Sequence, residues 1–139
     1  MAKYKRLGDM LIAEALRRNS RGNLIQSTAL AALAETGTDS ALATTLRFTA
    51  YGKDRNLRIH AINLLANQWK SREDVCSALC RLLNDPSLTI RRVTARALGT
   101  MGNSLALEPL HQAASAASDG RLGRDIREAI DEIASRSHK

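Results

Sequence analysis

Three histidines are the residues of this chain best suited to acid–base or metal chemistry: His60, His111 and His138. A zinc hydrolase site of the helical type needs two histidines four residues apart, with a glutamate after the first that activates water. The three histidines lie far apart in the sequence, and none has a second histidine or a glutamate in that register. We therefore expect no catalytic residue and no enzyme activity from this chain alone.

Two cysteines, Cys76 and Cys80, stand four residues apart and could offer two thiolates to a soft metal ion. Two thiolates make only half of a tetrahedral site. Apolar residues surround them, among them Val75, Leu79 and Leu83. Because free cysteine is among the most buried residue types, we expect these two to pack in the core, with no bound metal and no cofactor.

Arginines at helical spacing are the best candidates for partner binding. Arg92 and Arg96 lie one helical turn apart and should project from the same helix face. Residues on the equivalent helices expected before and after extend the pair into a strip. This candidate strip consists of Arg58, Asn63, Arg92, Arg96, Arg124 and Arg127. The alternative is a solvated charged face, because Asp125 and Glu128 stand among the arginines.

The charge of the chain raises the possibility of a nucleic-acid partner. The formal net charge is +7, and clustered Lys and Arg bind phosphate with release of counterions. Residues 1–21 carry six basic and two acidic groups, which is +4 of that total. Binding to a nucleic-acid backbone through the basic N-terminal helix and the arginine strip is therefore the alternative to a protein partner.

A degenerate repeat organises the elements that would position these residues. The stretch from Ile90 to Gly102 recurs in weakened form from Ile25, Leu57 and Leu122, at spacings of 32 or 33 residues. In each copy the eighth and ninth positions hold a small or apolar pair, such as Ala97 and Leu98. A period of this length is typical of stacked helical pairs, which bind or space other molecules.

We expect an all-α fold, an α-α superhelix of about eight helices that forms a single domain over 1–139. The apolar content is mostly Ala and Leu, which favour helices. The expected elements are a leading helix at 5–18, repeats at about 24–50, 56–83 and 88–117, and a closing helix at 121–134. Within the repeats we expect helices at about 41–50 and 88–101, and we expect the chain to fray from residue 134. Ser71 is the expected N-cap of the helix 73–83, and Pro109 interrupts a helix expected at 105–117 unless that helix begins later.

The third copy resembles the short, bacterial-type HEAT repeat. The resemblance is carried by Asp85-Pro86, Ile90-Arg91, Ala97-Leu98-Gly99 and Gly102. It implies a scaffold or protein-binding solenoid, with the candidate strip on its concave face. It also implies a ladder of hydrogen bonds between repeats, to which Asp85 and Arg91 would belong. An enzyme of this fold, such as a bilin lyase, would need a pocket and a base that the sequence does not indicate.

The other copies lack the pair of residues that would continue the ladder. Where the third copy has Asp85, the second has Gly52 and the fourth has Ala117. We therefore expect stacking to depend mainly on apolar burial, at about 25 cal/mol per Å².

A narrower resemblance is to the C-terminal helical repeat domain of bacterial zinc aminopeptidases of the aminopeptidase N family. It is carried by the run 26–42, the turn 49–52, the segment 57–62 and the closing 119–121 with 127–130. It implies the non-catalytic part of a larger enzyme or a stand-alone relative of that domain.

The sequence also predicts where the protein resides. No apolar segment of signal-peptide length follows the N-terminus, and no run approaches eighteen apolar residues. We expect a cytoplasmic protein with an unidentified protein partner and no membrane partner.

Overall fold

The computed structural model describes residues 24–137, so the leading helix expected at 5–18 lies outside the described residues. Within that range the chain is all-α, with seven α-helices, two 3-10 helices and no strand. The chain divides into two compact units, an N-terminal unit of Met1–Leu64 and a C-terminal unit of Leu65–Lys139. The all-α repeat fold expected from the sequence is confirmed.

The N-terminal unit contains α2 (Leu24–Glu35), α3 (Asp39–Arg47) and most of α4 (Arg55–Gln68). Gly37 adopts φ 65 after α2, as its place at a helix end predicts. The next helix begins earlier than the expected residue 41, because the Thr38 side chain accepts the N–H of Ala41 and caps it. Asp54 caps α4, with its Oδ2 3.0 Å from the N atom of Asn56.

The C-terminal unit begins with α5 (Glu73–Arg81), which continues as a 3-10 turn, η2 (Leu82–Asn84). The expectation that Ser71 caps α5 is wrong. Arg72 occupies the N-cap position without a side-chain cap. Instead, Asp74 in the first turn receives two hydrogen bonds from the Arg72 guanidinium, of 3.0 and 2.8 Å.

The helix α6 (Leu88–Met101) has the bounds that the sequence predicts. Ser87 caps its first turn, and Gly102 ends it in the left-handed region at φ 70. The following helix does begin later than residue 105: a 3-10 turn, η3 (Ser104–Ala106), precedes α7 (Leu107–Ala116). Pro109 therefore lies in the first turn of α7, where its missing N–H breaks no helical hydrogen bond.

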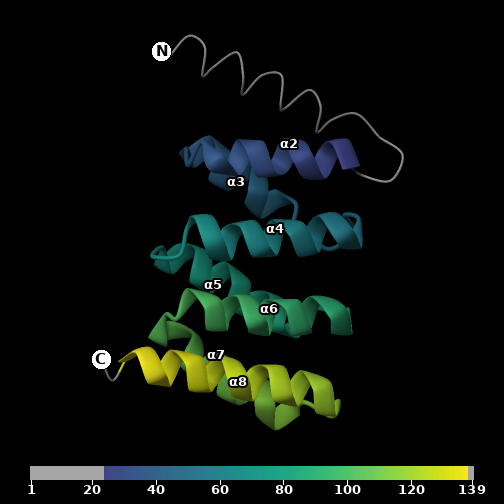
Figure 1. Ribbon diagram of the computed structural model, residues 1–139. Helices are drawn as coiled ribbons and strands as arrows, with labels where there is room; N and C mark the ends of the chain where they lie inside the picture. The colour runs from purple at the N-terminus through teal and green to yellow at the C-terminus, as the bar shows by residue number, and fades with distance from the viewer. Residues whose placement is uncertain (1–23, 138–139) are drawn as a thin grey trace. The chain divides into compact units, whose positions relative to one another are not determined.

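The last helix, α8 (Gly120–Ser137), extends beyond the expected end at residue 134. Figure 1 shows α8 beside α6 and α7 in the C-terminal unit. The core of this unit contains the fully buried Ile90, Leu98, Leu110 and Ile126. The backbones of α6 and α8 approach closely, since a Cβ added at Gly99 would lie 3.0 Å from the Cα of Ala129.

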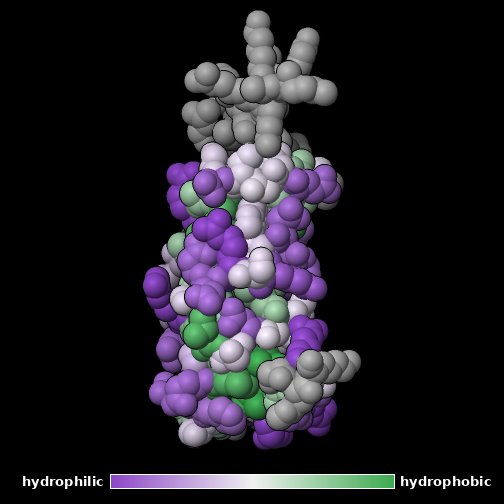
Figure 2. Space-filling model, turned by 90° about the vertical axis from the view of Figure 1, so that its left-hand side faces the viewer, coloured by the Kyte–Doolittle hydropathy of each residue, from purple (hydrophilic) through white to green (hydrophobic). Residues whose placement is uncertain are grey.

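The described surface is mainly polar. On the face drawn in Figure 2, hydrophilic side chains cover most of the surface, and the most hydrophobic ones gather over the C-terminal unit. Among the described residues, the exposed large hydrophobic side chains are Tyr51, Leu88 and Leu105. None of the described helices is both long enough and apolar enough to cross a bilayer.

Candidate interaction surface

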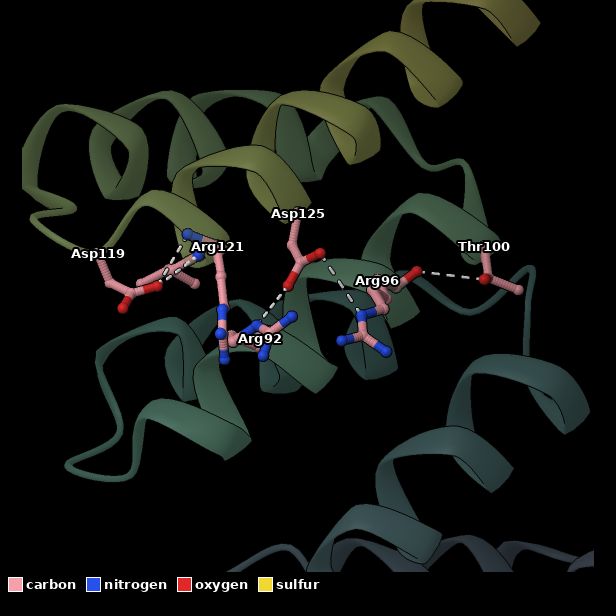
Figure 3. Close-up of polar contacts among 7 residues, drawn as sticks. Arg92, Arg96, Thr100, Asp119, Arg121 and Asp125 are labelled. Atoms are coloured by element: carbon pink, nitrogen blue, oxygen red, sulfur yellow. Dashed lines mark hydrogen bonds and ion pairs between the residues drawn. The ribbon is translucent and has the colours of Figure 1, made fainter.

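A carboxylate held between two arginines marks the contact of α6 with α8. The Nε of Arg92 donates to Oδ2 of Asp125 at 2.8 Å, and the Nε of Arg96 lies 3.6 Å from the other carboxylate oxygen, Oδ1 (Figure 3). The side chains of Asp125, Arg92 and Arg96 are 9%, 28% and 59% exposed. Asp125 is therefore an internal counter-ion, and Arg96 faces solvent.

The repeat places these three residues together. Arg92 and Arg96 are one turn apart on α6, and Asp125 follows Arg92 by 33 residues, close to one period of the repeat. Residues about one period apart lie near one another on neighbouring helices of a repeat stack. In the sequence, Asp125 stands out only as an acidic residue among the arginines of the strip, although its spacing from Arg92 also indicates the pair.

Arg136 holds the other end of α6. Its Nη1 donates to the carbonyl oxygens of Gly99, at 3.2 Å, and Thr100, at 2.7 Å. These carbonyls belong to the last turn of α6, where the helix dipole favours a positive charge. The sequence does not indicate this role of Arg136, because the closing helix is expected to end at residue 134.

Asp119 caps the start of α8. Its Oδ1 accepts the backbone N–H groups of Arg121, at 2.9 Å, and Leu122, at 3.0 Å (Figure 3). The pKa of Asp119 is held below its usual range, mainly by the hydrogen bond from the N–H of Leu122. The hydrogen bond from Arg121 and the positive charges of Arg121 and Arg92 lower the pKa further. We use the term α6–α8 seam for the surface made by Arg92, Arg96, Asp119, Arg121, Asp125 and Arg136.

The remaining members of the candidate strip lie in different environments. Arg124 and Arg127 are exposed on α8, and Asn63 is exposed on α4 in the N-terminal unit. Arg58 is only 4% exposed, and its Nε donates to the carbonyl of Thr49 at 2.9 Å. A place for Arg58 in a solvent-facing strip is therefore wrong, because its guanidinium ties the turn before α4 to that helix.

The two residues expected to form the ladder, Asp85 and Arg91, have different surroundings. The Oδ2 of the buried Asp85 accepts the backbone N–H of Ser87 at 3.0 Å, which supports the turn into α6. The Nε of Arg91 is buried and has no hydrogen-bond partner among the described residues. A ladder through Asp85 and Arg91 stays a prediction.

The described histidines and cysteines lie in three different helices. The Nε2 of His60 lies 3.1 Å from the carbonyl oxygen of Ser27, 33 residues earlier. His111 is exposed, and His138 lies outside the described residues. Cys76 is buried in α5, and its hydrogen bond to Cys80, together with burial, raises the pKa of the Cys80 thiol. In the described part of the chain, no group of three or more His, Cys, Asp or Glu could hold a metal ion.

Comparison with known proteins accounts for this architecture. The family model for HEAT repeats matches residues 45–131, which is more than half of the chain. The chain belongs to the HEAT-repeat family. The HEAT resemblance of the third copy is thus confirmed, and the match extends it to both units. No curated protein matches the sequence of this HEAT-repeat protein.

Proposed function

We propose that this HEAT-repeat protein is a non-catalytic interaction or scaffold module that binds an acidic protein surface through the α6–α8 seam. HEAT repeats typically mediate protein–protein contacts. The observation that carries the proposal is the position of Arg96, which is 59% exposed and reaches Asp125 only at 3.6 Å. That distance is beyond an ordinary hydrogen bond, so its donors can serve a partner carboxylate.

Preorganisation supports the same site. Arg92 and Asp125 form a 2.8 Å ion pair next to Arg96, whose Nε lies 3.6 Å from the same carboxylate. Arg124 adds an exposed cation on α8. Because an arginine already restrained on rigid helices loses less freedom on binding, such a surface favours association.

The test uses charge reversal at the exposed arginines and spares the buried pair. Arg96→Glu combined with Arg124→Glu should abolish capture of the partner by the immobilised protein, measured by quantitative mass spectrometry. The control is Arg55→Glu combined with Arg81→Glu, the same total charge change at exposed arginines of α4 and α5. Circular dichroism confirms that each variant folds. An identical set of captured proteins for both variants contradicts the proposal.

Nucleic-acid backbone binding remains the alternative function. Residues 24–137 contain fourteen Lys and Arg against twelve Asp and Glu, and Asp125 neutralises part of the seam. This balance favours a protein partner. The basic residues of 1–21 lie outside the described range. If the protein binds nucleic acid, each phosphate that it neutralises should lower the logarithm of the binding constant by about 0.9 for a tenfold rise in salt concentration. Absence of binding at low salt excludes this alternative.

The aminopeptidase relationship and the cytoplasmic location stay predictions. The narrower resemblance implies that this module accompanies a catalytic domain. The genomic sequence upstream of Met1 tests it: a continuous reading frame that encodes a His-Glu-x-x-His helix supports the relationship, and a stop codon in frame contradicts membership of a single longer chain. Fractionation of cells tests the location.

A further inference from the structure

A cavity of about 170 Å³ opens in the C-terminal unit, at the opposite end of α6 from Arg136. It is lined by η2, the first turn of α6, the end of α7 and the start of α8. Leu83, Leu88 and Leu122 supply apolar wall, and Asn84 and Ser118 supply polar groups. At roughly 30 Å³ for each water molecule of bulk liquid, the space suits a ligand of a few heavy atoms.

Arg91 is the one cation among the residues that line this cavity. Its Nε is buried and has no hydrogen-bond partner among the described residues. A buried donor on a charged group is costly to leave without an acceptor. Because the Nε is buried out of reach of a ligand, the two Nη groups are the donors that can meet a planar carboxylate, with parallel N–H groups on its two oxygens.

The repeat explains why the fourth copy lacks the carboxylate that the third copy carries. Copies of the repeat begin at Ile90 and Leu122, so the position equivalent to Asp85 in the next copy is Ala117. Ala117 also lines the cavity. Where the third copy carries a carboxylate, the fourth therefore presents a methyl group to the space beside Arg91.

Asp119 is the one acidic residue in the lining, and its carboxylate is engaged elsewhere. Its Oδ1 accepts the N–H groups of Arg121 and Leu122, at 2.9 and 3.0 Å. The charges that act on it are those of Arg121 and Arg92. Among the described residues, Asp119 forms no ion pair with Arg91.

We propose that this cavity binds a carboxylate carried on a short aliphatic group, with the carboxylate on Arg91 and the aliphatic part against Leu83, Leu88 and Leu122. Two sources share this chemistry: a free short-chain acid and the C-terminus of a polypeptide that ends in a small aliphatic residue. The inference does not depend on the proposed function, since Arg96 and Arg124 do not line the cavity.

The first experiment compares butyrate with butyramide, which has the same size and no charge. Titration of the full chain, followed by two-dimensional NMR of the backbone amides, should show saturable shifts with butyrate around residues 83–91 and 117–122. Butyramide should bind at least tenfold more weakly. Equal binding of the two compounds overturns the proposal, because the carboxylate would then contribute nothing.

Two variants test the assigned residues. Arg91→Gln removes the charge and should weaken butyrate binding at least tenfold, whereas Arg81→Gln, at an exposed arginine of α5, should leave it unchanged. Ala117→Asp supplies a carboxylate from the chain itself and should block butyrate while raising the melting temperature. Unchanged butyrate binding in Arg91→Gln refutes the site. Arg96→Glu with Arg124→Glu should retain butyrate binding, so this site and the proposed interaction surface can fail separately.

A peptide arm distinguishes the two sources. A tetrapeptide ending in valine with a free carboxylate is compared with its C-terminal amide. Tighter binding of the free-carboxylate peptide than of butyrate identifies a chain terminus as the source, and tighter binding of butyrate identifies a free acid. Failure of both carboxylates to shift any signal of the cavity at tens of millimolar overturns the proposal.

Discussion

The close approach of α6 and α8 predicts opposite effects for one substitution made at two glycines. A Cβ added at Gly99 would lie 3.0 Å from the Cα and 3.2 Å from the Cβ of Ala129. At Gly120, the first residue of α8, an added Cβ would meet nothing within 4 Å. Neither glycine has a positive φ, so alanine fits the backbone at both positions.

The expected magnitudes follow from two opposing effects. Alanine replaces glycine in a helix with a gain of up to about 1 kcal/mol. Overpacking of a close helix contact costs about 1–3 kcal/mol, because backbone atoms cannot move aside as a flexible side chain does. Gly99→Ala should therefore lower the free energy of unfolding by about 0–2 kcal/mol, whereas Gly120→Ala should raise it by several tenths of a kcal/mol.

Urea denaturation followed by circular dichroism at 222 nm measures both variants on the full chain. Ala129→Gly provides a further control: combined with Gly99→Ala it removes one of the two close contacts, and the coupling free energy between the two sites should be about 0.5–2 kcal/mol. If Gly99→Ala stabilises the protein as much as Gly120→Ala does, the close approach of the two helices is refuted.

Three further predictions concern polar groups. Asp125→Ala should lower the free energy of unfolding by about 1–3 kcal/mol in urea titrations, because Arg92 loses its partner at a largely buried site, whereas Arg96→Ala should cost less than about 1 kcal/mol; equal costs contradict the assignment. Asp119→Ala should lower the melting temperature and Asp119→Asn should not, since Asn also caps helices. Because folding lowers the pKa of Asp119, the loss of stability in Asp119→Ala should be complete above about pH 4 and should become smaller as the pH falls further. Cys80 should react slowly with a thiol reagent at pH 7, because its pKa is raised, and fast labelling without unfolding would contradict this.

The sequence predicted the helices well where local signals and the repeat agree. Ser87 and Gly102 bracket α6, and both bounds of that helix are as expected. Local signals did not predict helix ends and contacts that depend on residues far away in the sequence. Arg136 binds the end of α6 from a position 36 residues later, and no pattern near residue 134 indicates that α8 continues that far.

The candidate site was predicted in part, for the same reason. Helical spacing placed Arg92 and Arg96 on one face, and both do belong to the α6–α8 seam. Spacing alone could not separate an exposed arginine from a buried one. Arg58, another member of the candidate strip, is buried, and the carbonyl of Thr49, nine residues earlier, accepts its Nε–H.

The degeneracy of the repeat then explains why some arginines stabilise the fold and others are free to bind. Arg92 has a carboxylate 33 residues later, at Asp125, and the pair is tied into the α6–α8 contact. For the neighbouring Arg91, the position where the next copy would repeat Asp85 holds Ala117. Because the fourth copy has Ala117 in place of a carboxylate, Arg91 lines a cavity and its Nε has no partner among the described residues. In a degenerate solenoid, binding sites are therefore expected where one member of a repeated pair is missing.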